Sequence, residues 1–165
     1  MTIRFLRNKA VEVSPQPDGS IAVSWRQTDD LLKAEVNLNV QLPDLEIVEA
    51  RAELERLVPQ AWKGAPQLIK KIEGVRIGAG LRKIVQGLLG GAGGCPPLVH
   101  AILECSNAVI LHFTRPVIQV GESLEGEDKL ANLREMIRNN PRLVRSCVAF
   151  QDDSPIMQGL GADDR

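Results

Sequence analysis

The chain has 165 residues, and its 20 Lys and Arg residues nearly balance its 21 Asp and Glu residues. Because no block of Lys and Arg stands out, the charge pattern argues against nucleic acid and membranes as partners. No apolar run suits a signal peptide or a membrane span, and three scattered cysteines fit reduced thiols, so we expect a cytoplasmic protein. A chain of this length buries roughly 70% of its unfolded surface, which suffices for a core without disulfides.

The first third of the sequence predicts antiparallel strands. Apolar and polar residues alternate from Val11 to Val13 and again from Ile21 to Trp25. Between them, the residues PDGS at positions 17–20 are typical of a turn. We therefore expect two strands that are joined as a hairpin.

The alternation continues over residues 36–42 and, after a Pro-Asp break, over residues 48–54. One face of this part of the sheet should be buried and the other wet. Ile47 and Val48 are apolar neighbours, so the phase slips there and predicts a bulge or a late strand start. The residues predicted to be buried are Val36, Leu38, Val40, Val48, Ala50 and Leu54. The residues predicted to be exposed are Asn37, Asn39, Glu49, Arg51 and Glu53.

Helical spacing of the apolar residues begins after Pro66. A short apolar stripe over residues 68–72 is closed by Gly74, and a second stripe over residues 81–89 is closed by Gly90. Proline at the start and glycine just past the end are typical of helix boundaries. We expect both helices to pack on the sheet.

A third helix should run over residues 96–113. It is apolar on most sides, so we expect it to be the central helix of the fold. Truncation of Ile102 or Leu103 to alanine should then cost roughly 2–5 kcal/mol. The polar strip of this helix is formed by His100, Glu104 and Asn107.

The last third of the sequence predicts less regular structure. A loop over residues 115–126 should precede a helix over residues 130–137. Residues 142–150 fit either a short strand or a loop. Residues 151–165 carry too little apolar surface to be ordered, so we predict a flexible tail there and a single α+β domain over residues 1–150.

The segment GGAGGCPP at residues 90–97 carries the main candidate site. A thiol at the start of a helix, among glycine N–H groups, can have a lowered pKa and become nucleophilic or metal-binding. Glycines followed by prolines also form sharp corners, in which Cys95 would be a small buried residue, and we favour this interpretation. His100 follows Cys95 by five residues, so helical phase turns the two apart. The candidate binding residues are Gly93, Gly94, Cys95 and His100.

Motifs of nucleotide binding and of catalysis do not stand out. The segment GLLGGAGGC lacks the Lys-Ser/Thr of a phosphate-binding loop, and GVRIGAG has its glycines in the wrong order for a dinucleotide fingerprint. No Ser/His/Asp set and no paired-carboxylate spacing rises above chance in a chain this charged. We therefore predict no catalytic residues.

Three segments of the sequence together resemble an uncharacterised bacterial family, a domain of unknown function. These segments are PDGSIAVSWRQTDD, LEIVEARAEL and GVRIGAGLRKIVQGLLGGAGGCPPLVHAIL. The family shows Asp-Gly before a strand, then Gly-x-x-Ile-Gly-x-Gly, then Gly-Gly-x-x-Gly-Cys-Thr-His-Leu. The resemblance covers about residues 10–113. The family pattern is in turn similar to the iron–sulfur cluster assembly scaffolds, which implies a meander, a cysteine at the junction of sheet and helix, and a second cysteine that opens a later helix.

The resemblance implies an incomplete set of ligands in this chain. Cys95 stands where the family has its helix-opening cysteine, and Pro96 and Pro97 replace Thr-His. Trp62 or its neighbour stands near the position where the family has its junction cysteine. An iron–sulfur cluster or a structural zinc takes about four ligands. The residues that would have to be recruited are His100, Cys105, His112 and Cys147.

The sequence therefore predicts an α+β domain with an antiparallel meander of three or four strands and helices on one face, similar to the iron–sulfur scaffolds. Our leading hypothesis is a non-enzymatic binding or adaptor protein with a protein partner and no cofactor, and a homodimer is left open. The alternative is a cysteine-dependent sulfur-transfer or metallocluster-carrier protein that uses Cys95, with an iron–sulfur cluster or zinc as its cofactor.

Overall fold

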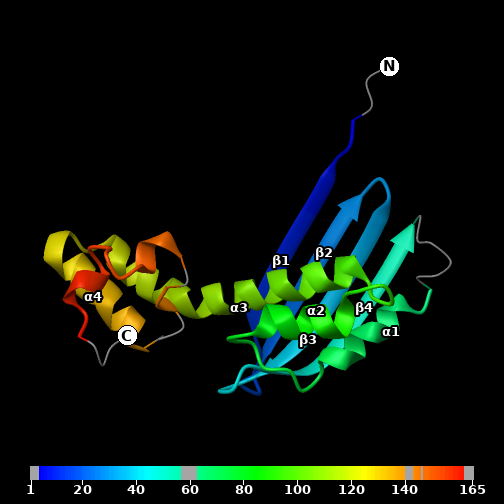
Figure 1. Cartoon of the computed structure of the whole chain (residues 1–165), viewed down its shortest axis with the longest axis horizontal. Helices are drawn as coiled ribbons and strands as arrows, with labels where there is room; N and C mark the ends of the chain where they lie inside the picture. Colours follow the sequence, from blue (N-terminus) through cyan, green and yellow to red (C-terminus); the bar gives the residue numbers. More distant parts are fainter. Residues whose placement is uncertain (1–3, 57–62, 140–142, 146, 162–165) are drawn as a thin grey trace. The chain divides into compact units, whose positions relative to one another are not determined.

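The computed structural model describes residues 4–56, 63–139, 143–145 and 147–161 of the chain (Figure 1). Two compact units divide between Val109 and Ile110, and helix α3 (Pro96–Glu122) contributes to both. A compact unit is not yet an independently folding domain, so the single domain over residues 1–150 stays a prediction. Within the described ranges, no helix has both the length and the apolar character needed to cross a membrane.

The first unit contains a four-stranded antiparallel sheet in the order β1-β2-β3-β4. Each strand pairs with the next one along the chain, which confirms the predicted meander and the α+β class. The strands are β1 (Arg7–Pro15), β2 (Ile21–Asp29), β3 (Leu32–Gln41) and β4 (Glu46–Arg56).

The turn between β1 and β2 follows from its sequence. Gly19 has φ +83°, which glycine adopts without strain. The Asp18 carboxylate accepts hydrogen bonds from the backbone N–H of Ser20 at 2.9 Å and from its hydroxyl at 2.7 Å. Gln16 donates its N–H to the Ser20 carbonyl and accepts one from Gly19. This is a three-residue hairpin loop with a left-handed glycine, and it sets the register of the hairpin.

The buried face of the sheet agrees with the predicted alternation except at β4. Val36, Leu38, Val40 and Ala50 are buried as predicted, and Leu54 is half-buried. The prediction for Val48 was wrong, because Val48 is 45% exposed and Ile47 is fully buried instead. The register shifts so that Ile47 faces Val40 and Glu49 faces Asn39, which leaves Val48 as the extra residue of the predicted bulge. On the other face, Asn37, Arg51 and Glu53 are exposed, and Asn39 and Glu49 are half-buried.

Helices cover one face of the sheet, as predicted (Figure 1). They are α1 (Ala65–Leu68), η2 (Ile69–Ile72), α2 (Leu81–Leu89) and the part of α3 that belongs to the first unit. Their apolar residues fill the space above the buried face: Ile69, Ile72, Val85, Leu89, Leu98 and Ile102 are all buried. Ile102 is fully buried and Leu103 half-buried, so α3 is embedded in the core on more than one side.

The second unit corrects the predicted loop over residues 115–126. Helix α3 continues through Pro116 to Glu122, and α4 (Gly126–Asn139) begins earlier than predicted. Proline inside a helix removes one backbone hydrogen bond, which weakens this helix but does not end it. Residues 148–150, predicted as a strand or a loop, form the short 3-10 helix η4 (Val148–Phe150).

The segment predicted to be a flexible tail contains buried residues. Met157, in η5 (Met157–Gly159), and Leu160 are buried beside Ile137. Arg134 of α4 donates to the Ile156 carbonyl at 3.1 Å. Met157 and Leu160 are three residues apart, so a 3-10 turn places both on one side of the segment, and this side is buried beside Ile137.

Candidate functional site

The glycines and Cys95 form a tight corner between α2 and α3. Cys95 donates its N–H to the Leu89 carbonyl at 2.8 Å, and its own carbonyl accepts from Leu98 and Val99 in the first turn of α3. Gly91 has φ +75°, and a Cβ at Gly94 would overlap the carbonyl oxygens of Leu89 and Gly90. Cys95 directly precedes α3, and the sharp corner favoured from the sequence is confirmed.

The Cys95 thiol is shielded at this corner. The residue is fully buried, and burial raises its pKa above the ordinary value for cysteine. Cys105 is also buried, and burial together with the neighbouring Glu104 charge raises its pKa to about 12. Both thiols therefore stay protonated near neutral pH, and a protonated thiol is neither a nucleophile nor a metal ligand.

The structure places the other candidate ligands in different surroundings. His100 is exposed on α3, whereas Cys95 is buried. His112 lies in the second unit, where its ring meets the Phe113 ring edge-on, and Cys147 is exposed in the same unit. Trp62 lies outside the described residues. Among the residues that the structure does describe, no three His, Cys, Asp or Glu side chains gather closely enough to hold a metal ion.

A polar cluster that the sequence did not predict ties β1 to α3. Trp25 is fully buried and donates its indole N–H to one carboxylate oxygen of Glu104. Lys9 donates to the other oxygen at 2.8 Å, and its ammonium group lies 5.9 Å from the centre of the Trp25 ring. Burial raises the pKa of Glu104, but the hydrogen bonds from Lys9 and Trp25 outweigh burial and lower it. Lys9 and Glu104 are 95 residues apart, so no local pattern could reveal this contact.

A buried carboxylate, that of Asp29, anchors the start of β1. Asp29 accepts from the backbone N–H groups of Leu31 and Leu32 at 2.9 and 2.7 Å, from Gln27 at 2.9 Å and from Arg7 at 2.7 Å. Burial raises the pKa of Asp29, but these four donors outweigh burial and lower the pKa to about 2. The Arg7 side chain of β1 is therefore held against Asp29, the last residue of β2.

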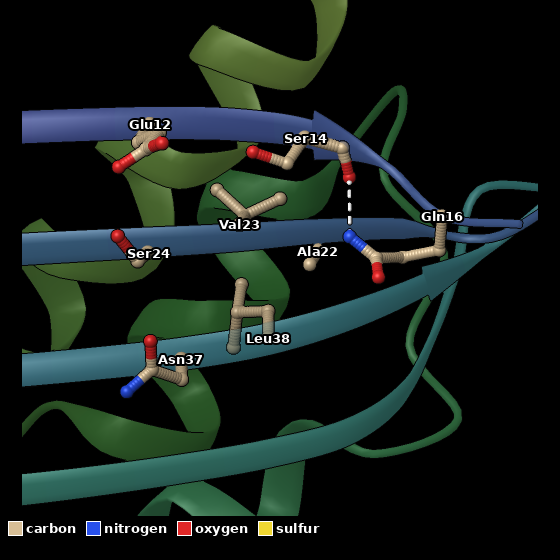
Figure 2. Close-up of a pocket in the computed structure, with 8 residues that line it drawn as sticks. All are labelled: Glu12, Ser14, Gln16, Ala22, Val23, Ser24, Asn37 and Leu38. Atoms are coloured by element: carbon tan, nitrogen blue, oxygen red, sulfur yellow. Dashed lines mark hydrogen bonds between the residues drawn. The ribbon is translucent and has the colours of Figure 1, made fainter.

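The face of the sheet away from the helices, called the outer face, carries a shallow depression of about 290 Å³ (Figure 2). Figure 2 shows the helices behind the strands, so the depression lies on the uncovered side. One hydrogen bond crosses its rim, from the Gln16 amide to the Ser14 carbonyl at 3.1 Å. Its lining mixes polar and apolar residues: Glu12, Ser14, Gln16, Ala22, Val23, Ser24, Asn37 and Leu38. A shallow surface of this kind does not enclose a small molecule as ligand pockets usually do.

The β4 edge of the sheet is covered by the chain itself. Ile47 donates its N–H to the Val75 carbonyl at 2.9 Å and accepts from Gly74 at 2.8 Å. The Glu73 carboxylate accepts from the Ala50 N–H at 2.9 Å. Residues 73–77 thus occupy the outward backbone groups of β4 at Ile47 and Ala50, in the first half of the strand.

The β1 edge is different, because β1 pairs with β2 alone in the part of the chain that is described. Gln16 and Ser20 form a hydrogen-bonded pair at the turn, and the pairing runs back to Arg7 without a register shift. Hydrogen-bonded and non-hydrogen-bonded pairs alternate along an antiparallel ladder. The even-numbered residues of β1 therefore bond to β2, and the odd-numbered residues turn their N–H and C=O groups away. We call these outward groups, on Arg7, Lys9, Val11 and Val13, the open edge.

Apolar side chains accompany the open edge. Val11 is 37% exposed although its strand partner Trp25 is fully buried. Phe5 and Leu6, directly before β1, are both about half exposed. A long, regular edge strand with exposed apolar residues is a template on which another strand can pair.

Comparison with models of known protein families, with curated proteins and with solved structures finds no match to this chain. The resemblance to a bacterial family and to the iron–sulfur scaffolds therefore stays a prediction. What the structure shows of the fold is a four-stranded antiparallel meander with helices on one face.

Proposed function

We propose that this chain is a non-enzymatic binding or adaptor protein that holds a protein partner by adding a strand of that partner to β1. The observation that carries the proposal is a contrast between the two edges: residues 73–77 cover the first half of β4, whereas the regular, nine-residue β1 pairs, among the residues described, with β2 alone. Strand addition is a common mode of protein recognition, since the backbone groups supply affinity and the alternating side chains supply specificity.

The side chains of β1 support the same proposal. The Lys9 and Arg7 side chains are engaged by Glu104 and Asp29, so they bind β1 to its own fold. Lysines on an edge usually discourage pairing when they stand free at the edge. With both cations engaged within the fold, the apolar Val11 and Val13 remain to contact an incoming strand.

The alternative function, sulfur transfer or metallocluster carriage through Cys95, finds less support in the geometry. That chemistry needs a thiolate with access to a donor or a metal. Cys95 is fully buried, and burial raises its pKa. We therefore favour binding, and we expect the protein to act without a cofactor.

A photo-crosslinking residue at Val11, in cells that express the full chain, tests the proposal. We expect Val11 to crosslink to one discrete protein segment, and we expect the same residue at Val48, on the covered β4 edge, to give no such product. Proline at Val13 removes an outward N–H and should abolish the Val11 crosslink without disturbing the β2 pairing. The proposal is wrong if Val11 gives no crosslink, or if proline at Val13 leaves the crosslink unchanged.

A further inference from the structure

The helix layer of the first unit comes from the most basic part of the sequence. Residues 63–103 contain six of the 20 Lys and Arg residues of the chain but only one of its 21 Asp and Glu residues, Glu73. This stretch is therefore basic in a chain whose remainder is acidic. Its cations are interspersed with apolar residues, so the fold decides whether they share a surface.

The cations of the sheet have partners within the fold. Arg7, Lys9, Arg26, Lys33 and Arg51 each lie within 3.5 Å of a carboxylate. Such pairs cancel the positive charge of the strands locally, so the sheet presents no patch of one sign.

Three cations of the helix layer differ from those of the sheet. Lys70 pairs with Glu73 at 2.8 Å, and the same carboxylate oxygen accepts from the Ala50 N–H. The one carboxylate of this stretch is therefore already engaged. Among the described residues, no carboxylate pairs with the remaining exposed cations of η2 and α2, which are Lys71, Arg82 and Lys83.

These three cations lie on neighbouring segments, since η2 contacts α2 in the helix layer (Figure 1). Ile69 and Ile72 are buried, and a 3-10 helix has three residues per turn, so Lys70 and Lys71 occupy the two other sides of η2. Lys70 shares its side with Glu73, which bonds to the outward edge of β4. Lys71 therefore lies on the side away from that edge, toward α2.

Arg82 and Lys83 stand in the first turn of α2, where positive charge is unfavourable. The N-terminal end of a helix carries a partial positive charge, so cations there cost stability and acidic residues would add to it. The first turn of α2 contains no acidic residue. Local conflicts of this kind are expected at functional sites. Because Arg82 and Lys83 neutralise no carboxylate in the described part of the fold, they are suited to negative charge from outside the chain.

An exposed apolar residue lies beside these cations. Ile84 follows Lys83 on α2 and is 44% exposed, whereas the core-facing residues of the same helix are buried. We call the surface formed by Lys71, Arg82, Lys83 and Ile84 the basic face.

We propose that the basic face binds an acidic segment of a partner protein in which carboxylates alternate with apolar side chains. The carboxylates pair with the cations, and an apolar side chain covers Ile84. Unpaired charge of one sign also steers partners of the opposite sign toward a surface. This inference goes beyond strand addition, because it uses the helix layer and does not depend on the β1 edge.

Two other anionic partners fit the basic face less well. No Phe, Trp or Tyr occurs in residues 63–103, so the face offers no ring on which nucleic-acid bases could stack. A helix that lies on a membrane turns its apolar side to the lipid. In α2, that side is buried in the core through Leu81, Val85 and Leu89. An acidic protein segment needs neither feature.

Fluorescence anisotropy with the full-length chain tests the proposal. The probe is a short fluorescein-labelled peptide in which Glu alternates with Leu, and the control peptide has Gln in place of every Glu. We expect saturable binding of the first peptide and none of the second. The binding should weaken as the salt concentration rises, because salt screens exposed charges.

Charge reversal on α2 locates the binding. The double variant Arg82→Glu/Lys83→Glu should bind the peptide at least about tenfold more weakly. It should also unfold at a higher denaturant concentration, since acidic residues suit the first turn of a helix. The matched control, Arg115→Glu/Lys129→Glu, changes two exposed cations of the second unit by the same charge and should leave the affinity unchanged.

Truncation of the apolar residue separates specific binding from general attraction between charges. Ile84→Ala leaves the charge of the basic face unaltered and should still weaken binding of the Glu-Leu peptide several-fold. An unchanged affinity in Ile84→Ala would contradict the apolar part of the proposed segment.

The remaining outcomes decide the occupant. The proposal is overturned if the Glu-Leu peptide does not bind, or if the control variant weakens binding as much as Arg82→Glu/Lys83→Glu does. If a single-stranded oligonucleotide or a vesicle containing phosphatidylserine binds the same face more tightly than the peptide, the acidic segment is the wrong occupant. Val13→Pro, which tests strand addition, should leave peptide binding unchanged, so each proposal can fail without the other.

Discussion

The two edge strands of the sheet, β1 and β4, differ in whether other segments of the chain cover their outward backbone groups. On β4, a bulge at Val48 breaks the regular ladder, and residues 73–77 occupy the outward backbone groups of Ile47 and Ala50. On β1, nine residues pair with β2 without interruption, and no described segment lies on the other side. Native sheets usually protect both edges, because an open edge pairs readily with another chain. This difference is the basis of our proposal that a partner adds a strand to β1.

The two edges also differ in how they are attached to the core. Ile47 on β4 is fully buried between Val40 and the segment that covers it. β1 contributes little buried surface, and it is held by the ladder to β2 and by two charged side chains, Arg7 and Lys9. Packing thus holds the covered edge, and polar contacts hold the open one.

The largest expected effect is at the covered edge. Ile47→Ala should lower the free energy of unfolding by roughly 2–5 kcal/mol, because it leaves a cavity in a fully buried position. Val11→Ala, the matched variant on the open edge, should cost less than about 1 kcal/mol in the isolated chain. Denaturant titration measures both. Equal losses at the two positions would contradict the contrast between the edges.

A smaller difference in the free energy of unfolding is expected between proline substitutions at even-numbered and odd-numbered residues of β1. Ala10→Pro removes an N–H that bonds to β2 and leaves the facing carbonyl without its donor, which should cost roughly 1–3 kcal/mol. Val11→Pro removes an outward N–H and should cost less than about 1 kcal/mol in the isolated chain. The comparison is made by thermal or denaturant unfolding at low protein concentration. A greater loss for Val11→Pro than for Ala10→Pro would show that the assigned alternation is wrong.

The anchor at Asp29 predicts a dependence of stability on pH. Its folded pKa of about 2 lies below the ordinary value of 3.8, so its contribution is fully present above about pH 4 and is lost as the pH falls toward 2. Asp29→Asn should flatten the stability profile over this window. Unfolding measured between pH 2 and 6 gives the profile. An unchanged slope in Asp29→Asn would show that Asp29 does not cause the pH dependence.

The smallest expected effect is at the partly exposed pair of Lys9 and Glu104. Lys9→Ala should cost about 0.2–1 kcal/mol, because the ion pair is partly screened by water. Glu104→Ala should cost more, since it also leaves the buried Trp25 N–H without an acceptor. A double-mutant cycle measures the coupling between Lys9 and Glu104. No coupling would mean that the pair does not hold β1 on α3.

Local patterns predicted most of the sheet and helix layer. The alternation predicted the strands, and the neighbouring Ile47 and Val48 predicted the bulge, although the sequence could not tell which of the two would be buried. Gly91, Gly94 and Cys95 predicted a tight corner, because glycine geometry is a local property.

The candidate surface could not be predicted in the same way. Whether an edge is open depends on the pairing of residues 73–77 with β4 and on the contact between Lys9 and Glu104, which lie far apart in the sequence. Only the fold brings these segments together. The sequence therefore indicated Cys95 as the candidate site, whereas the structure indicates the edge of β1 as the candidate binding surface.

Amide exchange along β1, followed by nuclear magnetic resonance, tests the central claim most directly. In dilute protein we expect the amides of Lys9, Val11 and Val13 to exchange rapidly and those of Ala10 and Glu12 to be protected by β2. If both groups are protected in dilute protein, the β1 edge is covered within the chain, and the account is contradicted.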